Sequence, residues 1–257
     1  MICLFSIECC NLTTDLQELG SILNLQRLLS APHTAQQISA LWAAYHASRS
    51  GGTGRGFVCA SIPLTVYEKM AKNGRKYPSF VVPVPHAQQQ RTAVSVASED
   101  NTAHEFYYLQ WDFNPPPPIP STTDDLFTKP TYTTPSGLSN PPTAMVLYTP
   151  LQEYKLRQTF ATPYLVLTMY TDLAATHGIV LLRGEITPTG TGHSSSKGRY
   201  MMSQEDAQLL VIALQRFYLW TKSKESGKDG IELLMAFHEK PQEFEWKDLL
   251  RFSEPTA

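Results

Sequence analysis

The spacing of hydrophobic residues predicts a helix near each end of the chain and several between them. Residues 16–29 are rich in leucine, which predicts a first helix. Thr34 and Gln37 have the spacing of a capping box, which starts a second helix. The apolar positions of this second helix follow the i, i+3, i+4, i+7 rule and are Ile38, Leu41, Trp42 and Tyr45.

The other helical patterns lie between and after the expected strands. Pro63 suits the first turn of a helix, and a short helix is expected at residues 150–158. Ser203, with Asp206 three residues later, caps a long helix. The residues expected to face the core in this helix are Leu209, Leu210, Ala213, Leu214, Phe217 and Tyr218. Two closing helices are expected at residues 231–240 and 243–252.

Six short apolar or alternating stretches predict strands. They are residues 57–62, 78–85, 104–113, 143–149, 163–171 and 178–186. The prolines of the second stretch suit an edge strand or the ends of strands. Several connections are too short for a parallel crossover, so the sequence predicts an α+β fold. We expect one domain with a mainly antiparallel sheet and helices packed on it.

Residues 114–142 interrupt this pattern, because they contain nine prolines among serines and threonines. Such a segment cannot build a regular ladder and has little to bury, so we expect a disordered or polyproline insertion. Gly- and Ser-rich segments at residues 50–56 and 188–200 are expected to be surface insertions as well. The predicted organisation is an N-terminal tail at 1–22, a domain at 23–252 and a C-terminal tail at 253–257.

Composition narrows the class of function. Lys plus Arg is 21 and Asp plus Glu is 23, so the net charge of −2 lacks the positive field that holds nucleic acid or an anionic membrane. Four cysteines with no Cys-x-x-Cys pair predict neither a disulfide framework nor a zinc site. We expect no membrane span, because no apolar run reaches about 18 residues.

Recognised catalytic motifs are absent from the sequence. The phosphate-loop, zinc-protease and serine-hydrolase patterns do not occur, and the seven histidines form no helical i, i+4 pair. The run GGTGRG precedes a strand rather than a helix, which is the wrong context for dinucleotide binding. We therefore expect no catalytic residue, no cofactor and no metal.

Arg183, Gly184 and Glu185 follow a fully apolar stretch and are the most conspicuous polar group in the chain. On a strand the two charged residues share one face. Three interpretations stay open: a structural ion pair, an Arg183 presented to a partner's carboxylate, or a small enzymatic site that also uses Asp172 and His177. A further alternative is an adaptor that acts through the Pro-rich loop.

Several longer stretches resemble a known family. YTPLQEYKL, PYLVLTMYTDLAATHGIVLLRGE and AQLLVIALQRFY are similar to the mitochondrial ATP synthase assembly factor 1 family, which chaperones the beta subunit of the F-one sector. The resemblance covers about residues 23–250 and is most specific over 149–185. The three insertions named above are longer than the family leads us to expect.

The resemblance implies a binding protein that holds unassembled beta subunit, prevents its aggregation and releases it to alpha subunit. It also implies a monomer in the mitochondrial matrix, although no presequence is visible: the first basic residue is Arg27. An apolar patch is expected to supply most of the contact. The expected partner-binding residues are Tyr154, Tyr170, Asp172, Arg183, Glu185, Phe217 and Tyr218.

Overall fold

The computed structural model describes residues 17–86, 103–120, 139–190, 199–219 and 229–253. Its strands are β1 (Phe57–Pro63), β2 (Ser79–His86), β3 (Ala103–Asn114), β4 (Thr143–Pro150), β5 (Leu165–Tyr170) and β6 (Ile179–Ile186). Its helices are α1 (Leu19–Ile22), α2 (Leu25–Ser30), α3 (Ala35–Gly52), α4 (Leu64–Lys76), α5 (Leu151–Arg157), the 3-10 turn η1 (Gln158–Phe160), α6 (Ala174–His177), α7 (Gln204–Tyr218), α8 (Gly230–Glu239) and α9 (Trp246–Ser253).

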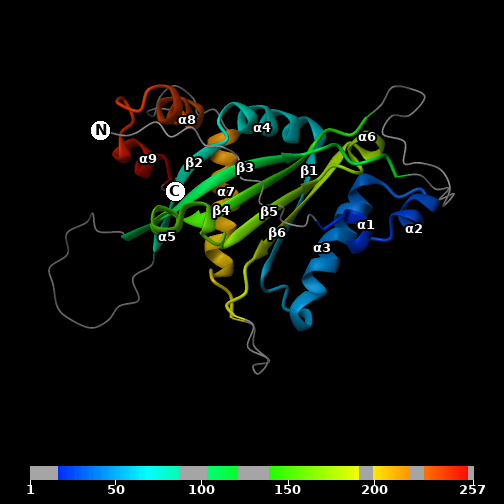
Figure 1. The fold of residues 1–257 in the computed structure, drawn as a ribbon. Coiled ribbons are helices and arrows are strands. Elements are labelled where there is room, and N and C mark those ends of the chain that lie inside the picture. The colour runs from blue at the N-terminus through cyan, green and yellow to red at the C-terminus, as the bar shows by residue number, and fades with distance from the viewer. Residues whose placement is uncertain (1–16, 87–102, 121–138, 191–198, 220–228, 254–257) are drawn as a thin grey trace.

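All six strands form one sheet in the order β1-β6-β5-β4-β3-β2 (Figure 1). Every neighbouring pair is antiparallel. The predicted α+β class, with a mainly antiparallel sheet, is therefore confirmed. β1 and β2 are the two edge strands. Along the chain, 16 residues separate β2 from β3 and 115 residues separate β1 from β6.

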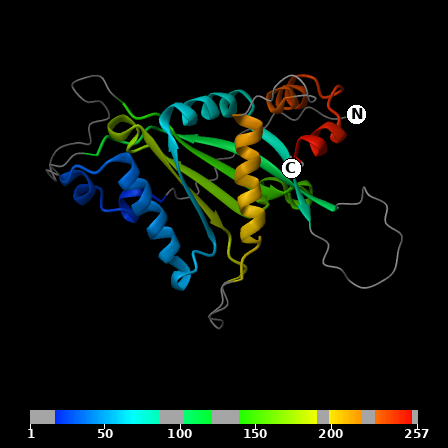
Figure 2. The ribbon, with the colours of Figure 1, turned by 180° about the vertical axis from the view of Figure 1, so that it is seen from behind.

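The first face of the sheet carries the larger hydrophobic core. Side chains from α4, α7, α8 and α9 pack on the inward residues of all six strands. Seen from behind, α7 crosses in front of the strands (Figure 2). Asn73 of α4 donates to the Tyr218 carbonyl at 2.7 Å, and the Tyr148 hydroxyl donates to the Leu210 carbonyl at 3.1 Å. These bonds satisfy polar groups that the packing would otherwise bury unpaired.

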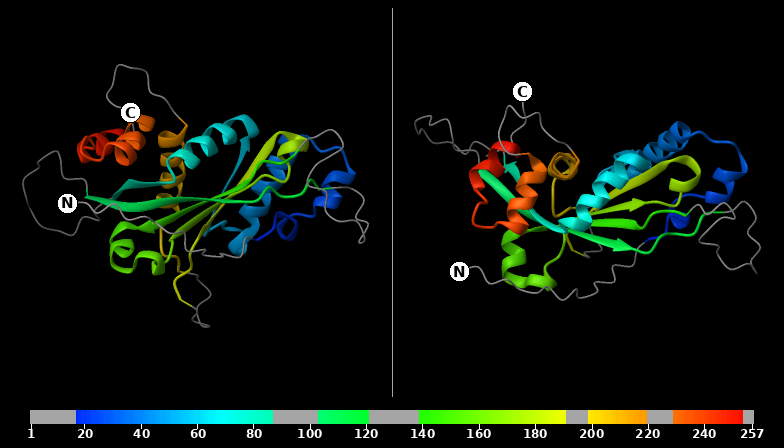
Figure 3. Two further views of the ribbon diagram at one scale, coloured as in Figure 1. Left: turned by 45° about the horizontal axis from the view of Figure 1, so that its top comes forward. Right: turned by 90° about the horizontal axis from the view of Figure 1, so that it is seen from above.

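The second face carries a smaller core and is covered unevenly. Residues of α1, α2 and α3 pack over β6, β5 and β1, with Ile38 and Trp42 fully buried. α5 lies at the other end of this face, where Tyr154 stacks on Tyr108 of β3 with ring centroids 4.1 Å apart. Figure 3 shows α5 on the opposite side of the sheet from α8 and α9.

Most helix starts agree with the sequence. The capping box at Thr34 is formed, and the Ser203 side chain accepts from the Asp206 backbone N–H at 3.0 Å. Pro63 is the N-cap residue of α4 rather than a residue of its first turn. Residues 16–29 are not one helix: the chain breaks between α1 and α2, because the Asn24 side chain accepts from Arg27 N–H and starts a new helix.

Two residues expected in the core are exposed. Leu209 of α7 lies on the outer side of the helix, and Val211 is buried instead. Leu41 of α3 is also exposed, while Ile38 and Trp42 carry the contact with the sheet. Spacing alone marks an apolar stripe, but its width depends on how many elements surround the helix.

The described residues add detail to the predicted organisation. The predicted tail at 1–22 includes α1, whose Leu19 is buried in the second core. Most of the predicted Pro-rich insertion lies outside the described residues, as do residues 191–198 of the later one. Asn140 donates to the carbonyls of Pro117 and Pro118, so the two ends of the Pro-rich segment lie together.

Candidate partner-binding surface

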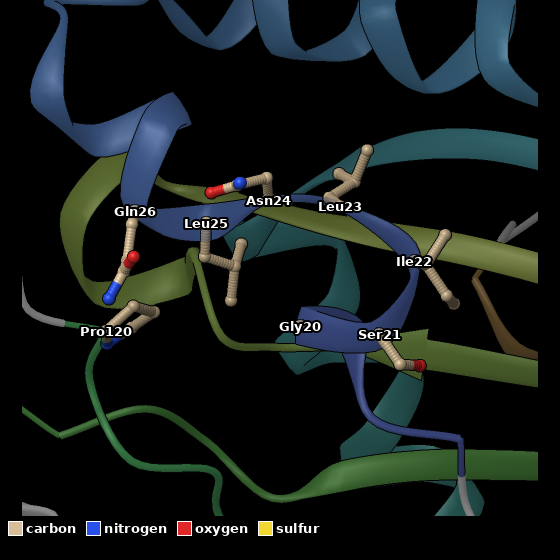
Figure 4. A pocket seen from close by; sticks show the side chains of 8 residues that line it. All are labelled: Gly20, Ser21, Ile22, Leu23, Asn24, Leu25, Gln26 and Pro120. Atoms are coloured by element: carbon tan, nitrogen blue, oxygen red, sulfur yellow. The ribbon is translucent and has the colours of Figure 1, made fainter. Parts of the chain in front are cut away.

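Cavities large enough to hold a small molecule occur in the described part of the chain. The first, about 560 Å³, is lined by residues 20–26 and Pro120. Figure 4 shows aliphatic and small polar side chains around it, with the amides of Asn24 and Gln26. No titratable side chain lines this cavity, so it presents no acid, base or nucleophile.

The second cavity, about 830 Å³, lies where α7 begins beside β3 and β6. Its charges have mixed sign: Arg55 and Arg199 against Glu105, Glu205 and Asp206. The carboxylate of Glu105 accepts from the buried Tyr107 hydroxyl at 3.0 Å. The cavity therefore has no arrangement of nucleophile, base and orienting group.

Arg183 and Glu185 form an ion pair on the second face, with Nε and Oε1 3.1 Å apart. The Nε–H direction misses the carboxylate, so the contact is electrostatic rather than a hydrogen bond. Arg183 Nη1 donates to Gln17 Oε1 at 2.6 Å, and the guanidinium lies over the Phe57 ring at 5.2 Å. The Arg183 side chain is 5% exposed and that of Glu185 is 47% exposed. Arg183 thus ties the start of the described chain to β1 and β6.

Gly184 needs no bulge, because the β1–β6 and β5–β6 registers run through it unbroken. Its missing side chain makes room on the first face instead. A Cβ at this position would lie 2.8 Å from Leu167 Cδ2 and 3.3 Å from Val58 Cβ. Arg183 and Glu185 therefore make a polar contact on the second face, while Gly184 between them allows close apolar packing on the first face.

The structure separates the residues of the enzymatic interpretation. Arg183 and Glu185 lie together, but Asp172 and His177 follow β5 around α6, where the His177 ring bonds to the Thr176 hydroxyl. Burial raises the pKa of Asp172 to about 6, its own backbone N–H opposes that rise, and Glu18 adds to it. No contact in the described part of the chain joins Asp172 or His177 to the Arg183–Glu185 pair.

The other expected partner-binding residues differ in access. Phe217 and Tyr218 are buried in the first core, and Tyr170 is buried in the second. Burial raises the pKa of Tyr170 to about 12, against the opposing charge of Arg183. These three side chains, like that of Arg183, cannot reach a partner without unfolding part of the domain. Tyr154 and Glu185 are partly exposed on the second face.

A straight row of half-buried residues crosses the second face. Each member lies opposite the next in the sheet register. From β2 to β1 this cross-sheet row is Ser79, Gln110, Leu147, Val166, Glu185 and Phe57. In the neighbouring row Met145, Thr168 and Arg183 are buried. The cross-sheet row is thus a partly open apolar and polar strip between α3 and α5.

α5 and η1 form an arm beside this row, residues 151–160, which we call the α5 arm. Leu156 and Phe160 on this arm are 85% and 86% exposed, more than any other large hydrophobic residue described. Gln158 between them has φ 50° and ψ −120°, a conformation that costs a residue with a side chain about 1–3 kcal/mol. Backbone strain beside exposed apolar side chains is typical of a binding site.

Sequence reasoning missed Leu156 and Phe160. They stand among Glu153, Lys155 and Arg157, and nothing in the spacing of a seven-residue helix shows which apolar side chains are covered. Glu153 and Arg157 pair with each other at 3.3 Å, while Leu156 and Phe160 remain exposed. The sequence did offer one signal for exposure: Leu156 and Phe160 are large apolar residues in a mostly polar segment.

The class of protein is an α+β domain with an exposed apolar arm and a half-buried strip on the sheet, and exposed apolar surface of this kind is typical of sites that bind another protein. No group of three His, Cys, Asp or Glu residues that could hold a metal occurs among the described residues. None of the helices in the described ranges is long and apolar enough to cross a membrane.

Comparison with known proteins places the chain in a family. Residues 8–250 match the profile of the ATP11 protein family, so the chain belongs to that family. A similar protein is "Protein atp11, mitochondrial" of Schizosaccharomyces pombe, with 28% identity over 224 residues. The match covers 87% of this chain and 58% of that relative's length.

Proposed function

We propose that this protein is an assembly chaperone of the mitochondrial ATP synthase. In this role it binds the unassembled beta subunit in the matrix, prevents its aggregation and releases it to alpha subunit. It acts by binding and needs no catalytic step. Membership of the ATP11 family and similarity to a relative named as mitochondrial support this proposal.

The observation that carries the proposal is the exposure of Leu156 and Phe160 on the α5 arm. An unassembled subunit exposes apolar interface, which drives aggregation until a partner covers it. Burying a leucine or phenylalanine side chain is worth about 1.5–3 kcal/mol. The two residues together can therefore supply a large share of a complex that forms at micromolar concentration.

The contact must be weak enough to be reversed by the true partner. A small apolar arm beside a half-buried strip meets this requirement better than a deep pocket. Release follows if alpha subunit and the chaperone compete for one surface of beta subunit. The charged residues around the arm, Glu153, Lys155 and Arg157, then set the choice of partner at the rim.

The test is suppression of aggregation. Denatured beta subunit is diluted from urea with and without purified protein, and light scattering is followed without nucleotide. We expect suppression at near-stoichiometric ratio, a preference for beta over alpha subunit, and displacement of the chaperone by alpha subunit. Absence of beta-subunit binding at micromolar concentration would refute the proposal.

Paired variants test whether the α5 arm makes the contact. Leu156→Ser with Phe160→Ser removes the exposed apolar side chains and should weaken beta-subunit binding by about 100-fold or more, since the two side chains together are worth about 3–6 kcal/mol and about 1.4 kcal/mol is a factor of ten. Because these side chains are exposed, the unfolding midpoint should hardly change. Leu209→Ser with Ile212→Ser, on the exposed side of α7 across the sheet, is the matched control and should bind normally. Equal binding by both double variants would remove the arm from the interface.

A further inference from the structure

The two edges of the sheet are finished differently. The hydrogen bond from Trp111 N–H to the Pro78 carbonyl shows which residues of β2 direct their backbone groups toward β3: Pro78 and the even-numbered residues after it. Odd-numbered residues of β2 therefore direct their backbone groups away from β3. Pro83 and Pro85 occupy such positions and have no N–H to offer. The Ser79 carbonyl at this edge accepts from the His238 ring at 2.6 Å. The β2 edge thus resists addition of another strand.

The β1 edge has no such protection over its middle. Its ladder with β6 carries the bonds Ile186 N–H to Gly56 carbonyl and Leu64 N–H to Gly178 carbonyl. In the register with β6, even-numbered residues of β1 face β6, and odd-numbered ones face outward. The N–H and C=O groups of Cys59 and Ser61 therefore point away from the sheet. No side-chain or loop hydrogen bond from the described part of the chain reaches these four groups.

At its start the β1 edge already holds a substitute for a neighbouring strand. The side-chain amide of Gln204 accepts from Gly56 N–H at 3.1 Å and donates to the Phe57 carbonyl at 2.6 Å. The N–H and C=O of one residue in an added strand would make the same two kinds of bond. Two residues beyond Ser61, Pro63 ends the edge. The open stretch between these limits offers paired donors and acceptors that suit an extended backbone.

We propose that the edge of β1 at Cys59 and Ser61 binds an extended, uncharged segment of the unassembled beta subunit as a seventh strand of the sheet. This inference rests on the proposed function, because it takes its partner from there. The segment is uncharged because β1 itself, from Phe57 to Pro63, contains no charged residue and its residues 57–61 are half-buried. The open edge runs over residues 59–61, and a bound segment of about five residues would extend past it at both ends. Figure 2 shows β1 between α3 and α7.

A single backbone donor can be removed with little change to the ladder. In Ser61→Pro the lost N–H is one that faces outward, as already holds for Pro63. Ser61→Ala is the matched control, because it removes the hydroxyl and keeps the N–H. We expect Ser61→Pro to bind refolding beta subunit at least tenfold more weakly than wild type, and Ser61→Ala to bind as wild type does. Far-UV circular dichroism establishes that both variants are folded.

Hydrogen exchange supplies a second readout that needs no variant. In the wild-type complex with beta subunit, the amides of Cys59 and Ser61 should exchange at least tenfold more slowly than in the free protein. Overlapping 12-residue peptides that cover the beta-subunit sequence, tested singly, should identify one extended segment that gives the same protection.

The outcomes separate the two proposals. If wild type does not bind beta subunit, the proposed function fails. If wild type binds but Ser61→Pro and Ser61→Ala bind equally well and Cys59 and Ser61 exchange as before, the strand inference fails and the proposed function stands. If these amides are protected without beta subunit, in proportion to protein concentration, the edge pairs with a second copy and the inference is overturned.

Discussion

Replacing either member of the Arg183–Glu185 pair should lower the free energy of unfolding by different amounts. The size of each loss shows whether the pair serves to compensate the buried charge of Arg183. The guanidinium is 5% exposed, while the carboxylate is 47% exposed. Removal of the carboxylate leaves a buried cation beside the Gln17 oxygen, the Phe57 ring and the Tyr170 hydroxyl. Removal of the guanidinium leaves a carboxylate that water already reaches.

The magnitudes follow from that asymmetry. Breaking a fully buried ion pair costs about 3–5 kcal/mol, and the half-exposed Glu185 lowers this to about 1–2 kcal/mol for Glu185→Gln. Arg183→Met keeps an unbranched side chain and removes the buried charge, so we expect a loss within about 1 kcal/mol. Arg183→Ala also leaves a cavity and should cost about 2–4 kcal/mol.

Urea denaturation at pH 7.5, followed by far-UV circular dichroism, measures the three free energies of unfolding. The slope against urea should stay equal among the variants, so that differences in midpoint report stability. Binding of beta subunit is measured below the unfolding transition. We expect Arg183→Met to bind almost as wild type does, because the wild-type guanidinium lies inside the second face.

The reasoning is refuted by either of two results. In the first, Arg183→Met is as unstable as Arg183→Ala while Glu185→Gln leaves stability unchanged. The buried charge of Arg183 then does not depend on Glu185 for compensation. Alternatively, Arg183→Met could unfold normally and lose beta-subunit binding, which would place the guanidinium at the interface.

Three further changes have defined outcomes. Gly74→Ala places a Cβ 2.6 Å from Cδ2 of the packed Trp111 ring and should lower the free energy of unfolding by about 1–3 kcal/mol in urea titration, despite the better helix propensity of alanine. Asp172 has a pKa of about 6 when folded, against 3.8 ordinarily, so its ionisation costs stability as pH rises from about 4 through 6. Asp172→Asn should therefore raise the free energy of unfolding by about 1–2 kcal/mol at pH 7.5 and by almost nothing at pH 3.5, and an equal effect at both values would contradict the assignment. Gln204→Ala removes two hydrogen bonds to the start of β1 and should speed exchange of the Gly56 amide at least tenfold, with unchanged exchange as the opposing result.

The sequence by itself determined the elements and their class. Apolar or alternating stretches marked all six strands, and the prolines of residues 78–85 indicated an edge strand or strand ends; the sheet order makes β2 an edge. Capping chemistry located the starts of α3 and α7, because a side chain that bonds to a backbone N–H three residues later acts locally. The side chain of Asn24 acts in the same way, although the leucines around it concealed the break between α1 and α2.

The tertiary structure alone decided which of these residues another protein can reach. Tyr170, Phe217 and Tyr218 are of residue types that are common at interfaces, yet they lie in the two cores. Leu156 and Phe160 are of residue types that are common in cores, yet they lie in solvent. The same holds for β1: its sequence reads as a strand, but its position at the edge follows from pairing with β6, more than a hundred residues later. Exposure depends on contacts between segments distant in the chain, and local spacing carries no information about those contacts.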